Sequence, residues 1–573
     1  MHLTGGALVA RALADEGISL TFGIPGTHNI ELYDALAESD AVRPVLVTDE
    51  QSASFMADGY WRASGRLACV NVVPGAGLTH ALSGIAEAFM DNIPMLVLGC
   101  GIRRDIPRAY QLHDIDQLAV VRPVTKAAFR VERGEDLYPE IRRACALARS
   151  GAPGPVMVEV PVNLYLRQYD IPEGSLQTPS RSAVPTGADA LSAVAALLND
   201  PVARPLLYVG LGAARAAAEL LLLAERLEAP VATTFQGKGV FPESHPLFLW
   251  NGFGAAAPPF ARAVAGDRHV TLAVGCRFSE VGTGSYGLEP PGPLIHVDID
   301  PGVPGRNYPV QQAVTADAAA FIGGLLPLVT QRPTDAALRR AIASGHEGVW
   351  KEWRSQQSER VTPPRLLRDV QDAFGPETIF TTDSGNGTFL AMECLRLERS
   401  GKFLAPVDYS CMGYAVPAAI GAKLARPECP VVALAGDGAL LMTGLELLTA
   451  AQEKLGVAVL VLRDRELAQI SQFQATALNR KTASELADYD AGGIAAALGV
   501  EALSLERDGD LPAILRRVRE ITGTGHPVLV DVAIDYSRRT YFTAGVVKTN
   551  LLRLPWRDRL RFIGRALKRR IFG

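Results

Sequence analysis

Short runs of Val, Ile and Leu alternate along most of the chain with longer segments rich in Ala, Leu and Glu. Apolar runs of this length are typical of parallel strands that are buried on both faces. Their alternation with helical segments predicts α/β domains. The expected strands cover residues 20–24, 44–48, 68–73, 94–99, 155–161, 205–210, 230–235, 270–275, 294–300, 378–383, 431–436, 457–463 and 527–534.

These strands fall into three groups, which predict three doubly wound parallel-sheet domains over residues 1–168, 187–330 and 361–540. The Pro/Ser/Thr-rich stretch Pro172–Thr186 reads as a linker, and residues 336–360 as a charged helical connection. The first and third units have similar size and plan. Residues 541–573 change composition and are expected to form a basic, amphipathic C-terminal helix.

Composition narrows the class of protein. The chain has 573 residues, a net charge of −4 and a pI near 6.2, so no general attraction to nucleic acid is implied. Its seven cysteines are scattered without a CxxC pair, which favours reduced, buried thiols in a cytoplasmic protein. We see neither a signal peptide nor an apolar stretch long enough to span a membrane.

The stretch 431–464 carries the strongest chemical signal. It predicts a strand, a tight turn at Asp437–Gly438, a helix over 440–455, a second strand, and then Asp464. Two carboxylates at the carboxyl ends of neighbouring parallel strands suit Mg²⁺ held against a phosphate-sized anion. Gly436 and Gly438 let the backbone approach that anion closely. This pattern resembles the diphosphate- and magnesium-binding motif of thiamine-diphosphate (ThDP) enzymes.

Glu50 follows an expected strand and opens a helix, where an acid is also favourable without any function. The surrounding segments 23–29, 49–66 and 74–98 resemble the pyrimidine-binding domain of the acetohydroxyacid synthase and pyruvate oxidase branch of ThDP enzymes. The resemblance extends over about residues 1–545. It implies that Glu50 hydrogen-bonds the cofactor's aminopyrimidine ring, beside Pro25, and helps to remove the proton from its reactive carbon. Partial burial would shift the pKa of such a carboxyl toward neutrality.

The resemblance assigns the rest of the cofactor site to the third unit. Met412 is the expected prop for the bent cofactor, although a lone Met is more often core. Mg²⁺ is expected to bind the side chains of Asp437 and Asp464 and the carbonyl of Glu466. Arg463, where many relatives have Asn, leaves the local charge balance open. The residues expected to contact the cofactor are Pro25, Glu50, Gly385, Asn386, Met412, Gly436, Asp437, Gly438, Ala439 and Asp464.

The middle unit holds FAD in some members of this family. Segments 233–248, 275–280 and 296–301 resemble that domain, but the loop 251–258 departs from the usual flavin loop, so FAD binding stays open. Arg277 matches an Arg near the flavin and the second substrate. His28 and His113 match positions at the reacting centre, and Phe473 matches a Trp of the acceptor pocket. An ordinary polar or buried role is the alternative for each His.

The function expected from this resemblance is a ThDP- and Mg²⁺-dependent lyase or carboligase acting on 2-oxo acids, similar to acetolactate synthase. The alternatives are a flavin-linked oxidase of the pyruvate oxidase type, a lyase that cleaves 2-hydroxyacyl-CoA or 1,2-diketone C–C bonds, and a catalytically inactive regulatory subunit. Glu50, Asp437 and Asp464 together argue against the last. The resemblance also implies a homodimer at least, with a tetramer allowed.

The C-terminal stretch 551–573 carries eight Arg or Lys against one Asp. Trp556, Leu560, Ile563, Leu567 and Ile571 recur at helical spacing and predict one apolar stripe. Three roles fit this stripe: packing on the protein's own surface or partner subunit, peripheral contact with an anionic membrane, or a basic lid over an anionic substrate such as an acyl-CoA.

Overall fold

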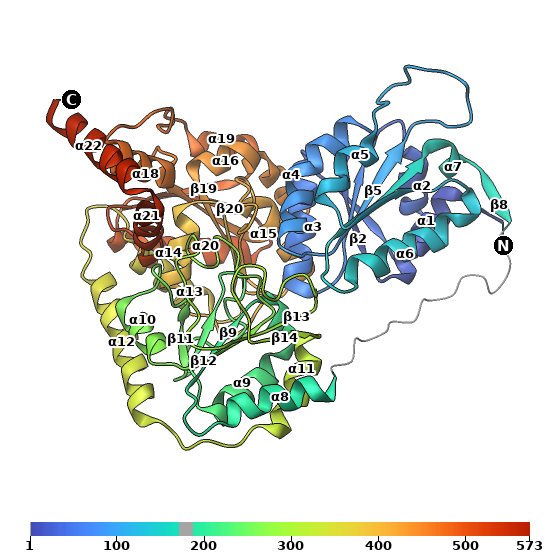
Figure 1. The fold of residues 1–573 in the computed structure, drawn as a ribbon. Helices are drawn as coiled ribbons and strands as arrows, with labels where there is room; N and C mark the ends of the chain where they lie inside the picture. Colours follow the sequence, from blue (N-terminus) through green and yellow to red (C-terminus); the bar gives the residue numbers. More distant parts are fainter. Residues whose placement is uncertain (1, 171–186, 573) are drawn as a thin grey trace.

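The computed structural model describes residues 2–170 and 187–572 (Figure 1). The predicted linker Pro172–Thr186 lies outside the described residues. Three six-stranded sheets, each parallel throughout, form the frame of the molecule, and this confirms the predicted α/β class. A small antiparallel ribbon joins β1 (His2–Thr4) to β8 (Gln168–Asp170).

The first and third sheets have the same strand order. Counted along the chain within each sheet, the order is 2-1-3-4-6-5 in both, so the predicted similarity of the two units is confirmed. The first sheet runs β3 (Arg43–Leu46), β2 (Leu20–Gly23), β4 (Cys69–Val72), β5 (Met95–Gly101), β7 (Pro155–Pro161), β6 (Ala127–Arg130). The third runs β16 (Phe403–Leu404), β15 (Ile379–Thr382), β17 (Val431–Gly436), β18 (Val457–Arg463), β20 (Val528–Ala533), β19 (Glu501–Leu505).

The middle sheet has a different order, 3-2-1-4-5-6, which is the arrangement of dinucleotide-binding folds. Its strands are β11 (Phe248–Asn251), β10 (Val231–Thr233), β9 (Pro205–Val209), β12 (Val270–Val274), β13 (Leu294–Asp298) and β14 (Gln312–Thr315).

Helices connect the strands and cover the sheets (Figure 1). The first unit has α1 (Gly5–Asp15), α2 (Ile30–Ala37), α3 (Glu50–Ser64), α4 (Ala76–Met90), α5 (Gln117–Val121), α6 (Leu137–Arg149) and α7 (Val162–Leu166). The middle unit has α8 (Ala188–Asn199), α9 (Ala217–Leu227), α10 (Pro259–Gly266) and α11 (Ala318–Leu325), and α12 (Ala336–Arg354) leads to the third. The third has α13 (Pro363–Phe374), α14 (Asn386–Cys394), α15 (Ala415–Ala425), α16 (Asp437–Thr443), α17 (Leu447–Gln452), α18 (Ala468–Leu478), α19 (Ala491–Ala497) and α20 (Leu511–Gly523), followed by α21 (Tyr541–Arg553) and α22 (Trp556–Phe572).

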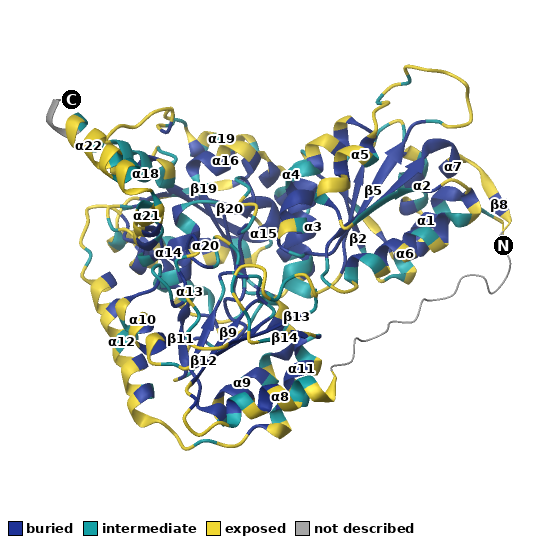
Figure 2. Cartoon of the chain, viewed as in Figure 1, coloured by how far each residue is buried: buried dark blue, intermediate teal, exposed yellow. Residues whose placement is uncertain are grey.

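The third sheet lies between two hydrophobic cores. Successive side chains of a strand point to opposite faces, and along β18 this alternation divides the residues between the cores. Val459 and Val461 belong to the core shared with the first unit, whereas Leu460 and Leu462 belong to the core shared with the middle unit. The buried strands of all three sheets are visible in Figure 2.

Helices α3 and α15 join the first and third units through direct backbone contact. A Cβ atom on Gly59 would overlap the carbonyl oxygen of Ala418, and one on Gly421 would overlap that of Met56. Only glycine permits this approach at both points. The helix that begins with Glu50 is therefore held rigidly against the third unit.

Two further expectations can be compared with the structure. All seven cysteines are free, and six are buried, as predicted. None of the helices in the described part of the chain has the length and apolar composition needed to cross a membrane.

Candidate active site at the carboxyl edges of two sheets

Asp437 and Asp464 meet where β17 and β18 end. The strands pair in parallel with Gly436 opposite Leu462, so the next residues of both leave the same edge of the sheet. The Oδ2 atom of Asp437 accepts hydrogen bonds from the backbone N–H groups of Asp464 (3.3 Å) and Arg465 (2.7 Å). Both residues thus follow the ends of paired strands, and the backbone of Asp464 lies against the Asp437 carboxylate.

The local structure around Asp437 differs from the expected turn and long helix. Asp437 is the first residue of α16, and Gly436 is its N-cap. The predicted helix 440–455 is instead divided by the 3₁₀ helix η5 (Gly444–Glu446) into α16 and α17. Gly444 is a poor helix former, which accounts for the break.

Burial shapes the electrostatics of this edge. Burial, together with the charge of Asp437, raises the pKa of Asp464 to about 7. Burial also raises the pKa of Asp437, against the effect of the backbone N–H groups that bind it. Two partly desolvated carboxylates so close together are stabilised by a bound cation.

Arg463 does not add its charge to this pair. Its guanidinium donates to both carboxylate oxygens of Asp531 (2.7 and 2.9 Å) and to Glu506 (3.2 Å). The sequence left open how the charge of Arg463 affects the site. In the structure, the carboxylates of Asp531 and Glu506, outside the site, pair with that charge. The carboxylate of Glu466 pairs with Lys481, so only its backbone carbonyl can serve the predicted metal role.

Asp383, which the sequence analysis did not single out, organises the neighbouring loop after β15. Its buried carboxylate accepts hydrogen bonds from the N–H groups of Gly413 and Ala415, both at 2.9 Å. Burial raises its pKa to about 6. These bonds fix the backbone next to Met412, whose Cε atom lies 3.6 Å from the position of a Cβ on Gly438. Asp383 ends a predicted strand within the segment 381–387, and this position could have identified it as a candidate site residue.

The residues of this edge fit a magnesium diphosphate. A Cβ atom on Gly385 or Gly436 would meet no other atom within 4 Å, so both backbones face open space. Gly385, with φ +136°, is the N-cap of α14, which begins at Asn386. Open backbone beside two carboxylates provides the oxygen ligands that Mg²⁺ prefers and room for phosphate oxygens.

The matching edge of the first sheet holds Glu50. It is buried as the first residue of α3, and Asp49 caps the helix by accepting from the N–H of Gln51 at 2.7 Å. A Cβ atom on Gly77 would lie 2.8 Å from Glu50 Oε1, so the missing side chain leaves space there. His80, also missed by sequence reasoning, has its Nδ1 atom 3.6 Å from Glu50 Oε2.

Asp49, Glu50 and His80 are the one group of three potential metal ligands gathered within 4.8 Å in residues 2–170 and 187–572. The predicted metal trio, Asp437, Asp464 and Glu466, is not gathered in this way. Backbone N–H groups bind the Asp437 carboxylate, and Lys481 holds the side chain of Glu466. The predicted role of Glu466 depends on its backbone carbonyl, and a grouping of side-chain ligand atoms does not test it.

The structure brings His28 and His113 together. Their rings lie 5.5 Å apart in an edge-to-face arrangement. Burial, with His113 adding a smaller effect, lowers the pKa of His28. Asn29 shapes the loop that carries Pro25 and His28, because its Oδ1 atom accepts from the N–H of Gly26 at 2.6 Å. His113 has a φ of +67° and its carbonyl approaches Gly75, which lies on the segment leading to Gly77.

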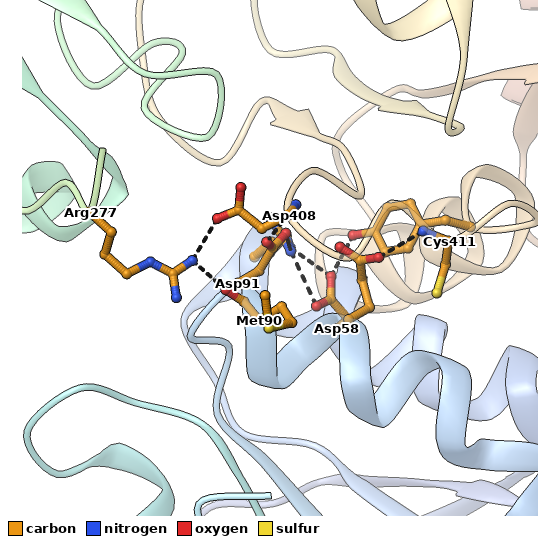
Figure 3. A network of polar contacts seen from close by, with 9 residues as sticks. Asp58, Met90, Asp91, Arg277, Asp408 and Cys411 are labelled. Atoms are coloured by element: carbon orange, nitrogen blue, oxygen red, sulfur yellow. Dashed lines mark hydrogen bonds and ion pairs between the residues drawn. The ribbon is translucent and has the colours of Figure 1, made fainter. Parts of the chain in front are cut away.

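No hydrogen bond between described residues joins Arg277 to His28 or His113. It donates to Asp408 at 2.7 Å and to the carbonyl of Met90, at the junction of all three units (Figure 3). The backbone N–H of Asp408 in turn donates to Asp91 at 3.2 Å, and Arg62 bridges Asp91 and the buried Asp58. These contacts of Arg277 tie the middle unit to the first and third units.

The same network reaches the loop that carries Met412. The N–H of Cys411 donates to the buried carboxyl of Glu87 at 2.9 Å, and Tyr414 donates to Asp58 (Figure 3). Phe473 is half-buried on α18, the helix that follows the Asp464 loop.

Comparison with known proteins identifies the three units. The N-terminal, central and C-terminal domains of thiamine pyrophosphate enzymes match residues 3–120, 191–325 and 383–532 respectively. The chain is 30% identical over 552 residues to the probable acetolactate synthase large subunit of Methanocaldococcus jannaschii, covering 93% of this chain and 92% of that protein. It is also 30% identical to the acetolactate synthase isozyme 3 large subunit of Escherichia coli, over 94% of this chain and 96% of that protein. The chain therefore belongs to the thiamine-diphosphate-dependent enzymes of the acetolactate synthase family.

Proposed function

We propose that the protein is a ThDP- and Mg²⁺-dependent carboligase that decarboxylates a 2-oxo acid and joins the remaining acyl group to a carbonyl acceptor. The observation that carries this proposal is the pair of acidic edges on two sheets of identical strand order. One edge presents Asp437 and Asp464, and the other presents the buried Glu50.

The third unit would hold the metal and the diphosphate. Asp437 and Asp464 supply carboxylate oxygens and Glu466 a carbonyl oxygen, which suits Mg²⁺. The backbone at Gly385, Asn386, Gly436, Gly438 and Ala439 leaves the phosphate oxygens accessible to N–H groups. Met412, on the loop that Asp383 organises, would act as the prop for the bent cofactor.

Glu50 would hold a proton at the pyrimidine ring. Bound ThDP would supply an acidic carbon which, once deprotonated, can add to a substrate carbonyl and then accept the electrons released by decarboxylation. Glu50 would form a hydrogen bond with a ring nitrogen of the cofactor, and the burial of its side chain would keep water from competing for that bond. Gly77 borders the same space, and Pro25 would contact the cofactor there.

His28 and His113 would hold or move protons on the substrate oxygen. The lowered pKa of His28 makes its imidazole a neutral donor and acceptor near pH 7, and the ring of His113 lies beside it. The same pair also suits a second candidate function, cleavage of a C–C bond beside a hydroxyl group, as in 2-hydroxyacyl-CoA or 1,2-diketone lyases. Phe473 and Arg277 would border the acceptor side once a second subunit completes the pocket.

We infer a homodimer as the minimum active form. Among the described residues, no hydrogen bond or ion pair joins Glu50, His28 or His113 to Asp437 or Asp464. Beside the metal edge, Leu441, Met442 and Leu445 are between 50% and 62% exposed, and Ile30 and Leu46 are exposed in the first unit. An apolar face of this kind is typical of a subunit interface.

The Glu50→Gln variant tests the proposal. The substitution keeps the shape of the side chain but removes the transferable proton, so turnover should fall about a hundredfold or more. Mg²⁺-dependent ThDP binding should stay nearly normal. Glu359→Gln, an exposed change in the same chain, is the control. Activity would be measured as CO₂ release and ligated product over a panel of 2-oxo acids with aldehyde and ketone acceptors. Near-normal turnover of Glu50→Gln would refute the assignment.

We also propose that the tail contacts an anionic membrane surface. Trp556, Leu560, Ile563 and Leu567 on α22 are between 42% and 65% exposed, although Arg569 donates to the carbonyl of Leu478 and ties the helix to α18 (Figure 2). Co-sedimentation with anionic vesicles at low salt should fall when the chain ends at Leu554, which keeps α21 intact. Equal sedimentation of both forms would exclude this role, and a selective loss of activity toward CoA esters would favour a lid.

A further inference from the structure

The middle sheet has the strand order of a dinucleotide-binding fold, and this predicts where a flavin would lie. In such sheets the ligand binds outside the carboxyl ends of the strands, at the point where the order reverses. Here that point lies between β9 and β12, whose register partners include Val209 and Val274. The residues that follow these two strands therefore decide whether the edge is open.

The two loops at this point are closed against each other. The N–H of Gly212, after β9, donates to the carbonyl of Gly275, after β12, at 3.1 Å. A Cβ atom on Gly210 would overlap the same carbonyl oxygen. Pyrophosphate binding in this fold requires free N–H groups on the first of these loops and the N-terminus of an α-helix behind it. The chain instead continues as the 3₁₀ helix η3 (Leu211–Ala216).

Aromatic side chains fill the space beside the loops. The ring of Tyr208 lies 5.2 Å from the rings of both Phe253 and Phe278, and its hydroxyl donates to the carbonyl of Gly282 at 3.0 Å. All three side chains are buried. A cavity lined by Phe253, Gly282 and Phe542, beside these rings, measures about 10 Å³, which is roughly the room of one water. A cofactor pocket needs on the order of 300 Å³ or more.

Helix α21 closes the remaining side of the edge. Phe542 stacks on Phe389 of the third unit (4.3 Å) and meets Phe235, which follows β10 (4.7 Å). One turn further, a Cβ atom on Gly545 would overlap the carbonyl oxygen of Ala255, so this helix touches the loop after β11 backbone to backbone. Thr540 caps the helix by accepting from the N–H of Thr543 at 3.0 Å.

The contact continues along the helix. The Thr549 hydroxyl lies 2.5 Å from the position of a Cβ on Gly287, Asn550 donates to Ser285 at 3.4 Å, and Arg553 lies over the ring of Tyr286 at 5.3 Å. The predicted single tail 541–573 is thus two elements, a packed helix and a protruding one (Figure 1). Pro555 separates them and is compatible with a new helix but not with a continuous one.

We propose that α21 is a built-in occupant of the nucleotide-binding edge of the middle domain, and that the protein binds no FAD or other nucleotide there. The residues present do not fit a flavin, because backbone, aromatic rings and α21 already take its volume and its hydrogen bonds. This inference rests on the proposed function, because it deepens the proposal of a non-oxidative ThDP enzyme. It excludes the flavin-linked oxidase from the alternative functions of the chain.

The test compares both cofactors in one preparation of the full chain. Purified protein is incubated with excess FAD, ThDP and Mg²⁺, freed of unbound ligand, denatured, and assayed for released flavin and thiamine. The expected result is ThDP near one per chain and flavin below a few per cent. Flavin near one per chain would overturn the proposal. Low ThDP with low flavin would refute the proposed function and leave the closed edge supported.

A matched pair of variants tests the role of α21 itself. Gly545→Ala forces a methyl group into the loop after β11, whereas Gly564→Ala, on α22, adds one where nothing lies within 4 Å. Gly545→Ala should lower Tm by several degrees and speed proteolytic cleavage within residues 541–553. Gly564→Ala should change neither. Identical Tm values and cleavage rates for the two variants would show that α21 is not held in this edge.

Discussion

The outer sheets and the middle sheet differ most at the edge where their parallel strands end. At the outer edges, Gly385 and Gly436 face open space, Gly77 leaves room beside Glu50, and backbone N–H groups hold the Asp437 carboxylate. At the middle edge, loops bond to each other, aromatic rings fill the interior, and α21 covers the outside. A six-stranded parallel sheet thus supports a cofactor site only where the loops at its edge leave open backbone beside carboxylates.

The largest effect is expected when strand-end acids are replaced at two edges, the open edge of the third sheet and the closed edge of the middle sheet. Asp437→Asn removes a charged metal ligand and should weaken Mg²⁺-dependent ThDP binding by about a hundredfold or more. Asp298→Asn changes an acid at the end of β13, where burial raises the pKa to about 6, and should leave ThDP binding within about twofold. Titration calorimetry with ThDP and Mg²⁺ gives both values. Equal losses would remove the distinction between the edges.

The two open edges should act together across subunits. A hybrid dimer of Glu50→Gln and Asp437→Asn chains retains one site with both residues intact. Half of randomly mixed dimers are hybrids, so activity should recover to roughly a quarter of wild type. Co-expression followed by a turnover assay measures this recovery. A fully active monomer, or no recovery in verified hybrids, would contradict the shared site.

The rigid junction between the outer units should be sensitive to one methyl group. Gly59→Ala places a Cβ against the Ala418 carbonyl and should cost about 1–3 kcal/mol of unfolding free energy. Gly323→Ala, on α11 with nothing within 4 Å, should be neutral or stabilising by less than about 1 kcal/mol. Urea unfolding compares the two. Similar stabilities would mean that α3 and α15 are loosely packed.

A pH-dependent effect concerns a buried carboxyl that contacts α21. Glu393 accepts from the N–H of Phe542 at 3.3 Å, and burial raises its pKa to about 8. Between the unfolded pKa of about 4.3 and this value, the folded chain keeps a proton that the unfolded chain has lost. Wild-type stability should therefore fall as pH rises through that window, by at most about 1.4 kcal/mol per unit.

Glu393→Gln mimics the protonated form and escapes this loss. Its stability relative to wild type should grow between pH 5 and pH 8, measured by urea unfolding, while exposed Glu359→Gln should show no such trend. A constant difference across this range would mean that Glu393 is ionised in the folded protein.

Much of this arrangement was predictable from the sequence. Central strands such as β17 and β18 are buried on both faces, and their unbroken apolar runs mark them clearly. Within the three six-stranded sheets, the pattern missed five strands, β6, β11, β14, β16 and β19, and all five lie at sheet edges. An edge strand pairs on one side only and is short, so its composition carries little signal.

The candidate site residues were predictable where a short sequence motif carries them. Asp437 and Asp464 end neighbouring strands, and the motif around Glu50 marks its helix start. Asp383 and His80 depended on contacts between distant segments and were missed. The closing of the middle edge by α21 joins residues nearly 300 positions apart, as in the contact of Gly545 with Ala255, which no local pattern records.

Thermal unfolding of the full chain with each cofactor tests the central claim most directly. A ligand that binds the folded state at about 100 times its Kd adds about 2.7 kcal/mol of stability. ThDP with Mg²⁺ should therefore raise Tm in wild type and not in Asp437→Asn, whereas FAD should leave the Tm of both unchanged. A rise in Tm with FAD, or none with ThDP and Mg²⁺ in wild type, would contradict the account.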